Sequence, residues 1–468
     1  MAIKSETYNL AVLGSGPGGY VGAIRAAQLG LKVALVEKEN LGGVCLNWGC
    51  IPTKALLKNA EVISLLQRAD EFGISISNYS ASFAKAVERS RKVSQQLSKG
   101  VEFLMKKNKV DVFYGHGRLT SREKLEILDQ NGLVTNEISA QKILLATGSR
   151  TKVFPGMEID GKRIIGSSEA MVLEEAPKSM AIIGAGAIGV EFAYLFSAYG
   201  TEITLIEMLP RILPLEDREI SETLQRSFKK RGIKVHTDAR VDALNPIDQG
   251  VEVVLSENGG KQTVTVEKVL LAVGRTPNSE NIGLESMGIR TEKGFITVDK
   301  NYRTNIENIY AAGDLIGAPL LAHVASAEAV AALEIMAGVE TSYLNYEAIP
   351  SCTYCQPQVA SVGLTEEKAK EKGYEVKVGK FFYRANGKAL AIGEPEGLVK
   401  IVTESKYGEI LGVHIIGAEA TELIAESSLG KAIEATYQDL GKTIHSHPTL
   451  SEMIMEAAKG VDGLAIHS

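Results

Sequence analysis

Cysteine is scarce in this sequence, and long uncharged apolar runs are absent from it. Four cysteines among 468 residues are too few for a disulfide framework. No apolar run is long enough to span a bilayer, and the first residues lack the apolar core of a signal peptide. We therefore expect a protein of the reducing cytoplasm without a membrane span. The net charge of −6 gives no electrostatic basis for a nucleic-acid partner, so we expect none.

The chain is too long for a single hydrophobic core. At roughly 150 residues per domain, 468 residues suggest about three domains. An apolar content of 45% is ordinary for a globular protein, and 46 glycines indicate many tight turns between strands and helices. The four cysteines form two pairs far apart in the sequence, so we expect no zinc site, which would need four ligands.

A run with two closely spaced cysteines, residues 42–54, carries the first chemical signal. Cys45 and Cys50 are separated by four residues, and the glycines around them allow the tight turns that would bring the thiols together. Pro52 suits the first turn of a helix, whose positive end would favour a thiolate, as would Lys54. We interpret the pair as a redox-active dithiol. The alternatives are buried structural thiols or a plain disulfide, which across so short a loop would gain little chain entropy.

The residues before this run have the pattern of a dinucleotide site. Tyr8–Leu13 predicts a buried strand, Gly14–Gly19 a glycine-rich turn and Tyr20–Leu29 a helix, and a second strand at Val33–Val36 ends at Glu37. The glycines let the backbone approach a pyrophosphate, the helix N-terminus stabilises its charge, and the acid can bind a ribose hydroxyl. Because the dithiol follows within a few residues, we expect it to neighbour this cofactor.

The same pattern returns later in the chain. Met180–Ile183 predicts a strand, Gly184–Gly189 the turn and Val190–Tyr199 the helix, and a strand at Ile203–Ile206 ends at Glu207. In both copies the acid follows the first glycine by 23 positions. We therefore expect an internal duplication and two dinucleotide sites.

The acid of the second copy bears on which nucleotide binds there. Glu207 would repel a 2′-phosphate, which favours NAD over NADP. Arg211 lies close enough in sequence to leave NADP open.

Several further elements connect these motifs. A long helix is expected over Ser82–Lys107 with Ser82 as its N-cap, short strands over Val112–Ile138, and a buried strand over Lys142–Ala146. Val264–Gly274 predicts one strand that closes the second nucleotide fold, with Arg275–Pro277 as an exit linker.

A strand over Asn308–Asp314 follows the second nucleotide pattern, so we expect the first nucleotide domain to be discontinuous. Asp314 has two open interpretations. It could cap a helix over Leu321–Met336, or it could bind a hydroxyl of the first cofactor.

From about Tyr346 the pattern changes to alternating strands at Val376–Tyr383, Leu398–Thr403 and Ile410–Ile416, followed by a helix over Ala420–Tyr437. This α+β module has no glycine-rich phosphate loop. We expect it to serve substrate binding, a partner or self-association.

Two histidines stand near the end of the module. His447 precedes a proline, and Thr449-Leu-Ser-Glu452 matches a capping box for the last helix. Either Glu452 only caps and His445 and His447 are surface residues, or one histidine serves a thiol as acid and base, oriented by a carboxylate. The pattern alone does not decide between these.

Taken together, these motifs resemble the dihydrolipoamide dehydrogenase family, within the class I flavoprotein pyridine-nucleotide disulfide oxidoreductases. The stretch Gly42–Lys54 looks like that family's active-site signature, and Ala146–Gly148, Ala311–Asp314 and His447–Glu452 follow in the family's order over essentially the whole chain. The resemblance implies an α/β fold with two Rossmann-like dinucleotide-binding domains plus a C-terminal α+β dimerisation domain. The implied boundaries are 1–147 with 276–345 for FAD, 148–275 for NAD and 346–468 for dimerisation.

The resemblance also implies residue roles. Cys45 would exchange with substrate and Cys50 would face the flavin, while His447, oriented by Glu452, would act as base across a homodimer interface. The implied FAD-binding residues are Gly14, Gly16, Gly19, Glu37, Lys38, Gly43, Val44, Lys54, Gly117, Thr147, Gly148, Ser149, Asp314, Leu320, Leu321, Ala322 and His323. The implied NAD-binding residues are Gly184, Gly186, Ile188, Gly189, Glu191, Glu207, Val241 and Gly274.

The activity implied is oxidation of dihydrolipoyl groups on acyltransferase or glycine-cleavage carrier proteins, with NAD as acceptor and homodimers as the working form. Related mercuric reductases carry a C-terminal cysteine pair, whereas no cysteine follows Cys355 here, and glutathione-type reductases favour NADPH. A non-catalytic dinucleotide-sensing or assembly subunit is a further alternative. Cys352 and Cys355 depart from the family pattern, and we expect them to be ordinary buried thiols, because positions three apart on a strand face opposite sides.

Overall fold

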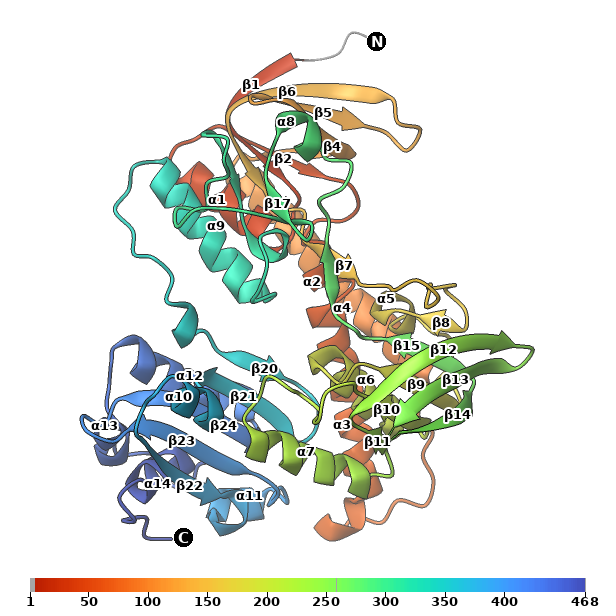
Figure 1. Cartoon of the computed structure of the whole chain (residues 1–468), viewed down its shortest axis with the longest axis vertical. Coiled ribbons are helices and arrows are strands. Elements are labelled where there is room, and N and C mark those ends of the chain that lie inside the picture. Colours follow the sequence, from red (N-terminus) through yellow and green to blue (C-terminus); the bar gives the residue numbers. More distant parts are fainter. Residues whose placement is uncertain (1–4, 258, 468) are drawn as a thin grey trace. The chain divides into compact units, whose positions relative to one another are not determined.

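The computed structural model describes residues 5–257 and 259–467 (Figure 1). The chain forms two compact units, each built from three separate stretches. Unit 1 comprises the residues up to Ala55, Ala86–Lys152 and Arg275–Leu344, and unit 2 comprises Leu56–Lys85, Val153–Gly274 and the residues from Asn345 on. The domain boundaries expected from the sequence remain predictions.

Unit 1 is built on a sheet with a parallel core. Its strands β1 (Ser5–Leu13), β2 (Val33–Glu37), β3 (Asp111–Tyr114), β6 (Val134–Leu145) and β19 (Ile309–Ala311) pair in parallel in the order β3-β2-β1-β6-β19. All five residues of β2 are buried, as in parallel sheets that are covered on both faces.

An antiparallel extension continues this sheet. Strands β4 (His116–Ser121) and β5 (Lys124–Leu128) pair antiparallel, and β5 joins the first half of β6. The expected separate strand at Lys142–Ala146 is therefore the second half of one 12-residue strand, β6. The first half of β6 pairs with β5 and its second half with β19, which explains why the sequence pattern changes along the strand.

Helices cover one face of this sheet. The helices α1 (Pro17–Gln28) and α9 (Ala322–Met336) share one hydrophobic cluster with the last turns of α4 (Phe83–Lys107). Small residues such as Ala23, Ala26 and Ala329 allow close packing there. The N-cap predicted at Ser82 is confirmed, because its hydroxyl accepts the Lys85 amide at 3.3 Å.

Unit 2 repeats the nucleotide-binding architecture. Five parallel strands lie in the order β11 (Lys234–His236), β10 (Glu202–Ile206), β9 (Ser179–Ile183), β15 (Lys268–Leu271) and β8 (Ile164–Ile165), with helix α6 (Ala187–Ala198) following β9. A second, antiparallel sheet of β12 (Ala239–Ile247), β13 (Gly250–Glu257) and β14 (Gly260–Val266) packs against it through buried apolar side chains.

The prediction of one strand over Val264–Gly274 is wrong. Strand β14 ends at Val266 in the antiparallel sheet, and β15 begins at Lys268 in the parallel sheet, so the chain changes sheets at Glu267. Both halves of the segment have the apolar pattern of a strand, and the charged pair Glu267 and Lys268 between them stands where the chain changes sheets. The expected linker Arg275–Pro277 is strand β16, which pairs with β7 (Ser149–Thr151).

The C-terminal part of unit 2 is a five-stranded antiparallel sheet. The strand order is β20 (Ser351–Thr353), β21 (Gln358–Gly363), β24 (Ile410–Gly417), β23 (Leu398–Glu404) and β22 (Val376–Phe382). Helices α12 (Ala420–Ala432), α13 (Tyr437–Lys442) and α14 (Glu452–Gly460) pack on it around a core of buried apolar side chains.

The prediction of one helix over Ala420–Tyr437 is also wrong, because α12 ends at Ala432. Glu434 then adopts a left-handed φ of 58°. Thr436 starts a new capping box, in which its amide and hydroxyl both donate to Asp439. The local capping signal outweighs the continuing helical pattern.

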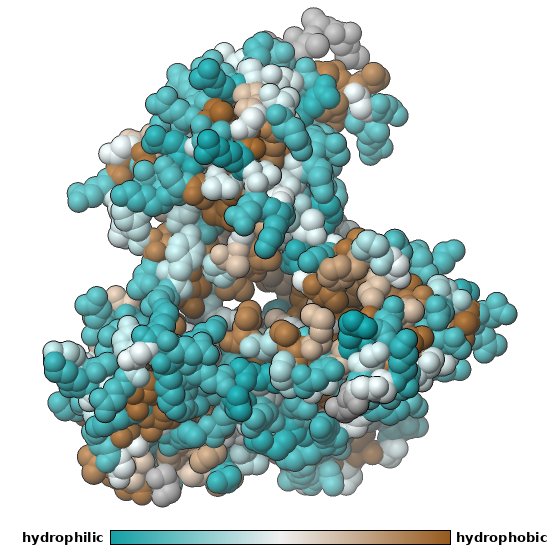
Figure 2. Space-filling view, viewed as in Figure 1, coloured by the Kyte–Doolittle hydropathy of each residue, from teal (hydrophilic) through white to brown (hydrophobic). Residues whose placement is uncertain are grey.

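No helix among the described residues is long and apolar enough to cross a membrane. Figure 2 shows that hydrophilic side chains cover most of the visible face, with smaller hydrophobic patches between them.

A buried polar cluster joins α7 (Arg218–Lys230) and α10 (Glu366–Glu371) to the C-terminal sheet. Lys400 of β23 is 3% exposed and donates to both carboxylate oxygens of Asp217, at 2.9 and 3.0 Å. It also forms an ion pair with Glu366 at 2.8 Å. The neighbouring Glu216 is also buried, and burial raises the pKa of Glu216 to about 7, against the opposing effects of a Ser361 hydrogen bond and the charge of Lys368.

Replacing Glu216 with Gln should change the pH dependence of stability. When burial raises the pKa of an acid, the folded protein holds the proton to a higher pH than the unfolded chain does. The free energy of unfolding therefore falls as the pH rises from the unfolded pKa towards 7. We therefore expect Glu216→Gln to stabilise the protein at pH 8, by about 3 kcal/mol, and to have little effect at pH 5. The measurement is the urea-unfolding midpoint at both pH values. Glu222→Gln on the exposed side of α7 controls for the lost charge, and an equal shift at both pH values would contradict the prediction.

Candidate active site

The two glycine turns have nearly the same backbone geometry. Gly14 and Gly184 adopt φ angles of 98° and 97°, a left-handed region that favours glycine. A Cβ atom on either residue would lie 2.4 Å from a backbone oxygen, that of Ala146 or of Ala272. Only glycine lets the end of one strand approach the next strand so closely.

The acids at the ends of the second strands are also equivalent. Glu37 Oε2 accepts the Ser15 amide at 2.9 Å, and Glu207 Oε2 accepts the Ala185 amide at 2.7 Å. Both carboxylates are buried. The duplication predicted from the sequence is therefore confirmed in backbone geometry and in hydrogen bonding.

Both turns leave room for an anion. A Cβ on Gly16 or Gly186 would meet no atom within 4 Å. Each of these glycines is the N-cap of a 12-residue helix, and no side chain caps the first amides of either helix. By contrast, a Cβ on Gly19 would lie 1.8 Å from Gly14 O, and one on Gly189 would lie 1.8 Å from Gly184 O. The closed glycines bring helix and strand together, and the open ones fit the pyrophosphate of a dinucleotide.

The dithiol lies against the first glycine turn. Cys45 is on the short helix α2 (Gly43–Asn47), and Cys50 is the first residue of α3 (Cys50–Gln67). The Gly42 amide donates to Ser15 O at 3.0 Å, and a Cβ on Gly43 would lie 2.7 Å from the Cα of Gly16. The expectation that dithiol and cofactor cradle are neighbours is confirmed for the backbone.

Side chains within the redox stretch hold the loop that carries the thiols. Buried Asn47 donates to the backbone oxygens of Leu41 and Gly43, at 3.0 and 2.9 Å. Thr53 donates to Gly49 O at 2.6 Å. These residues were not singled out from the sequence, because their partners are backbone oxygens that no pattern marks.

No disulfide joins Cys45 and Cys50 in this structure. A hydrogen bond with Cys50, and then burial, raise the pKa of Cys45, while the charge of Lys54 opposes the shift. The negative charge of a Cys50 thiolate adds to this upward shift of the Cys45 pKa. Because Cys50 opens α3, its charge meets the positive end of that helix.

A polar trio adjoins the dithiol. Ser149 donates a short hydrogen bond to Asp314, and Arg275 donates to the hydroxyl and the backbone oxygen of Ser149, each at 2.6 Å. Arg275 and Asp314 form an ion pair at 3.6 Å. Burial lowers the pKa of Arg275, whereas the charges of Asp314 and Cys50 raise it. Asp314 does not cap α9, whose N-cap Leu321 has no side-chain bond.

Arg275 adjoins the site although the sequence predicts a linker at Arg275–Pro277. Strand β16 holds it in place, and Asn278 continues the contact by exchanging hydrogen bonds with Thr147, at 2.8 and 2.9 Å. Tyr20 was also missed. It is half-buried on α1, where burial and the charge of Cys45 raise its pKa.

The other expected FAD residues lie around the same sheet edge. A Cβ on Gly117 would lie 2.4 Å from the side chain of Leu13, so β4 packs directly against β1. Gly148 has a left-handed φ of 71° with open space beside it. Lys38 and Val44 are exposed, and Leu320, Leu321, Ala322 and His323 lead into or begin the N-terminal end of α9.

The expected NAD residues belong to unit 2. The first strand of the antiparallel sheet starts beside Glu207, because the Ala239 amide donates to Glu207 O at 3.0 Å, and Val241 follows on that strand. Gly274 has a φ of 106° and open space beside it, and Ile188 is on the first turn of α6. Glu191 is buried and accepts the Tyr354 amide at 3.0 Å, a contact that the sequence did not suggest.

Arg211, which left NADP open, has a partner of its own. Its guanidinium donates to both oxygens of Glu367, at 2.6 and 3.4 Å. An arginine engaged by a carboxylate is less available to a 2′-phosphate, so this contact supports the preference for NAD.

The histidines differ sharply in their surroundings. His447 is 80% exposed, and its Nδ1 lies 3.0 Å from Glu452 Oε1. The other oxygen of Glu452 accepts the Thr449 amide at 2.9 Å, which lowers the pKa of that carboxyl together with the His447 contact. One of the two bonds of the expected capping box is therefore present, from the Thr449 amide to the Glu452 carboxylate. The other, from the Glu452 amide to Thr449 Oγ1, is replaced by a bond from Thr449 Oγ1 to Ser446 O. Glu452 thus both caps and orients a histidine.

The cysteines of the C-terminal module are separated by the end of a strand. Cys352 lies on β20 at the edge of the C-terminal core, whereas Cys355 is fully buried beyond that strand and donates to Pro357 O at 3.3 Å. No disulfide joins them, and the expectation of buried thiols is confirmed for Cys355, whereas Cys352 is only partly buried.

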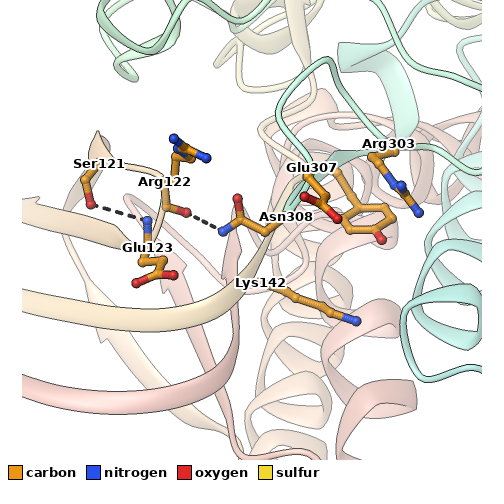
Figure 3. A pocket seen from close by; sticks show the side chains of 8 residues that line it. Ser121, Arg122, Glu123, Lys142, Arg303, Glu307 and Asn308 are labelled. Atoms are coloured by element: carbon orange, nitrogen blue, oxygen red, sulfur yellow. Dashed lines mark hydrogen bonds between the residues drawn. The ribbon is translucent and has the colours of Figure 1, made fainter.

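Two cavities open on unit 1. One, of about 580 Å³, is lined by Glu39, Asn40 and Tyr114 among others, and thus adjoins the strand end at Glu37. The other, of about 610 Å³, contains none of the expected site residues (Figure 3). Its cations have local roles, because Lys142 donates to Met336 O at the end of α9 and Arg303 lies over the Tyr310 ring.

Replacing Arg275 with Gln should weaken FAD binding, because Asp314 would lose its cation and Ser149 two hydrogen bonds. We expect the dissociation constant for FAD to rise roughly ten- to a hundredfold, as for loss of a hydrogen-bonded charge. It can be measured by quenching of flavin fluorescence on rebinding to the apoprotein. Arg150→Gln, at a 48% exposed arginine on β7, is the matched control. Equal retention of FAD by both variants would exclude this role for Arg275.

Comparison with known proteins places this geometry in a family. The family model described as pyridine nucleotide-disulphide oxidoreductase matches residues 8–329, and the model for its dimerisation domain matches residues 349–458. A curated relative from Bacillus subtilis (strain 168), named dihydrolipoyl dehydrogenase, is 45% identical over 98% of this chain and 99% of its own. Another of that name, from Chlorobaculum tepidum, is 48% identical over 96% of each chain.

Solved structures share the fold. LpdA from Mycobacterium tuberculosis superposes with a TM-score of 0.89 at 26% identity, covering 96% of this chain and 98% of that one. The HOCl-induced flavoprotein disulfide reductase RclA from Escherichia coli gives 0.84 at 26% identity, covering 97% and 99%. The α/β fold with a C-terminal dimerisation domain is thereby confirmed. The chain belongs to the pyridine nucleotide-disulphide oxidoreductase family and is an NAD-dependent flavoprotein disulfide oxidoreductase that uses FAD and NAD.

Proposed function

We propose that this enzyme is a dihydrolipoyl dehydrogenase, which oxidises protein-bound dihydrolipoamide to lipoamide and reduces NAD. The observation that carries the proposal is the dithiol Cys45/Cys50, whose loop touches the backbone of the first nucleotide cradle. The names of full-length relatives at 45–48% identity support the choice of substrate.

In the proposed reaction, His447 takes the proton from one thiol of the dihydrolipoyl group. The resulting thiolate attacks the sulfur of Cys45 in the oxidised enzyme, the Cys45–Cys50 bond breaks, and Cys50 leaves as a thiolate. The second substrate thiol then attacks the substrate sulfur bound to Cys45. This closes the lipoyl ring, and its proton passes to Cys45. Two electrons move from the substrate to the cysteines.

The protonation of the reduced pair fits this sequence. The raised pKa of Cys45 agrees with products in which Cys45 is a thiol and Cys50, the leaving group, is a thiolate. His447 keeps the other proton, and Glu452 stabilises the imidazolium. Protons and electrons therefore balance without a further reactant at this step.

The cofactors complete the reaction. FAD, when bound, accepts the two electrons of the dithiol, and NAD carries them away as hydride. The first glycine turn with Glu37, the Thr147–Ser149 turn and Asp314 are the residues that we assign to FAD. The second turn, with Glu207, is assigned to NAD.

The proposal extends to partners and place. The substrate would be the lipoyl domain of an acyltransferase or of a glycine-cleavage carrier protein, and the cytoplasm is the proposed compartment. The family's dimerisation domain spans residues 349–458 and supports a homodimer, in which His447 would serve the partner's dithiol.

Replacing Cys45 with Ser should abolish turnover of dihydrolipoamide, because a hydroxyl cannot form the disulfide. Bound FAD should remain, and the rate of NADH formation should fall at least a thousandfold. Cys352→Ser, in a thiol outside the proposed path, is the matched control and should keep full activity. Normal turnover by the Cys45 variant would refute the dithiol assignment.

Loss of the carboxylate that orients His447 should lower the rate without removing the base. We expect Glu452→Gln to reduce kcat roughly ten- to a hundredfold, and His447→Gln to reduce it by about 10²–10⁴. Steady-state rates of NADH formation from dihydrolipoamide measure both. If Glu452→Gln were as slow as His447→Gln, Glu452 would act as more than a positioning residue.

A further inference from the structure

Two histidine–glutamate pairs occupy one short segment. The histidine segment, residues 443–449, forms most of the connection between α13 and α14 and carries both His445 and His447. His447 pairs with Glu452 at the start of α14, and His445 pairs with Glu426 of α12. The proposed function uses only the first pair.

His445 is built into the fold. Its side chain is 6% exposed, and its Nε2 lies 2.8 Å from Glu426 Oε1, while its Nδ1 lies 3.0 Å from Thr443 O. Both contacts are acceptors, so a doubly protonated ring can donate to each of them. With both nitrogens engaged, His445 has no atom left to take a proton from a substrate.

His447 has the opposite surroundings. Its side chain is 80% exposed, and only its Nδ1 is bonded, to Glu452, among the residues that the structure describes. Threonine hydroxyls of the histidine segment bond nearby in the chain, from Thr449 Oγ1 to Ser446 O and from Thr443 Oγ1 to Asp439 O. The contact from His445 to Glu426 ties the part of the segment that carries the histidines to α12, while Asn386, the N-cap of α11 (Gly387–Ala391), donates to Thr449 O at 3.1 Å and ties the far end of the segment.

We propose that His445, held by Glu426, is a positioning residue that sets the location of His447 for proton transfer from the substrate thiol. This inference rests on the proposed function and adds residues to the same site. His445 and His447 are two positions apart, so a change in the backbone at His445 moves the base directly. A small misplacement of a catalytic group is enough to cost a large factor in rate.

The charge arrangement around Glu452 agrees with this role. The Thr449 amide, then the bonded His447 and the charges of His447 and His445, lower the pKa of Glu452. His445 therefore lies close enough to act on the carboxylate that orients the base. Glu426 supplies the compensating negative charge on its other side.

The test compares two reactions of the same holoenzyme. Oxidation of dihydrolipoamide by NAD needs His447, whereas reduction of an artificial quinone by NADH needs the cofactor sites but no thiol substrate. We expect His445→Ala and Glu426→Ala to lower kcat with dihydrolipoamide at least tenfold, with KM within about twofold and quinone reduction unchanged. Glu426→Gln, whose amide oxygen still accepts from Nε2, should recover much of the rate.

Controls separate positioning from a general loss of structure. Glu422→Ala removes an exposed carboxylate from the same helix and should leave both reactions unchanged. Bound flavin and the oligomeric state are measured for every variant.

The outcomes are distinct. Full dihydrolipoamide activity of His445→Ala, with His447→Gln inactive, would overturn the inference and leave the proposed function intact. Equal loss of both reactions would also overturn it, because the pair would then be structural only. A wild-type enzyme that does not oxidise dihydrolipoamide would instead refute the proposed function.

Discussion

The close approach of two backbone segments, at Gly42 and at Ser15, decides where the redox chemistry takes place. The amide of Gly42 donates to the oxygen of Ser15, inside the glycine turn that faces the first nucleotide. Because Gly43 has no Cβ, its backbone can reach the Cα of Gly16. The helix that starts at Cys50 follows directly, so main-chain contacts place the thiols beside the cradle. The side chains of Asn47 and Thr53 then hold the loop in this position.

Carboxylates with divided duties recur at the functional positions. Glu37 gives one oxygen to the Ser15 amide and the other to Glu39, and Glu207 does the same for Ala185 and Leu209. Glu452 gives one oxygen to a backbone amide and the other to a histidine. In each case the hydrogen bonds of a buried or half-buried carboxylate hold a loop and fix the orientation of the carboxylate at the site. Such bracing limits the reorganisation that a reaction would otherwise require.

Much of this could be predicted from the sequence, since local patterns produced it. The two strand–turn–helix units, the helix after Ser82 and the dithiol each depend on residues that are close in sequence. Failures occurred where a tertiary choice decided the outcome. The segment Val264–Gly274 belongs to two sheets, and the helical pattern after Ala432 is stopped by a left-handed residue and a new cap. The sequence could not predict the roles of Arg275 and of Glu426, the partner of His445, because their contacts join residues that are far apart along the chain.

The discontinuity of unit 1 has a consequence for biosynthesis. Strand β19 pairs with β6, with Ile309 beside Ile143, and Asp314 reaches Ser149 just beyond that strand. The stretch Val153–Gly274, which belongs to unit 2, is translated between them. During synthesis, the second half of β6 therefore lacks its β19 partner until the residues beyond Ile309 leave the ribosome, and the first nucleotide fold stays incomplete until then. The second nucleotide fold can form earlier, so the order in which the two sites mature is opposite to their order in the sequence.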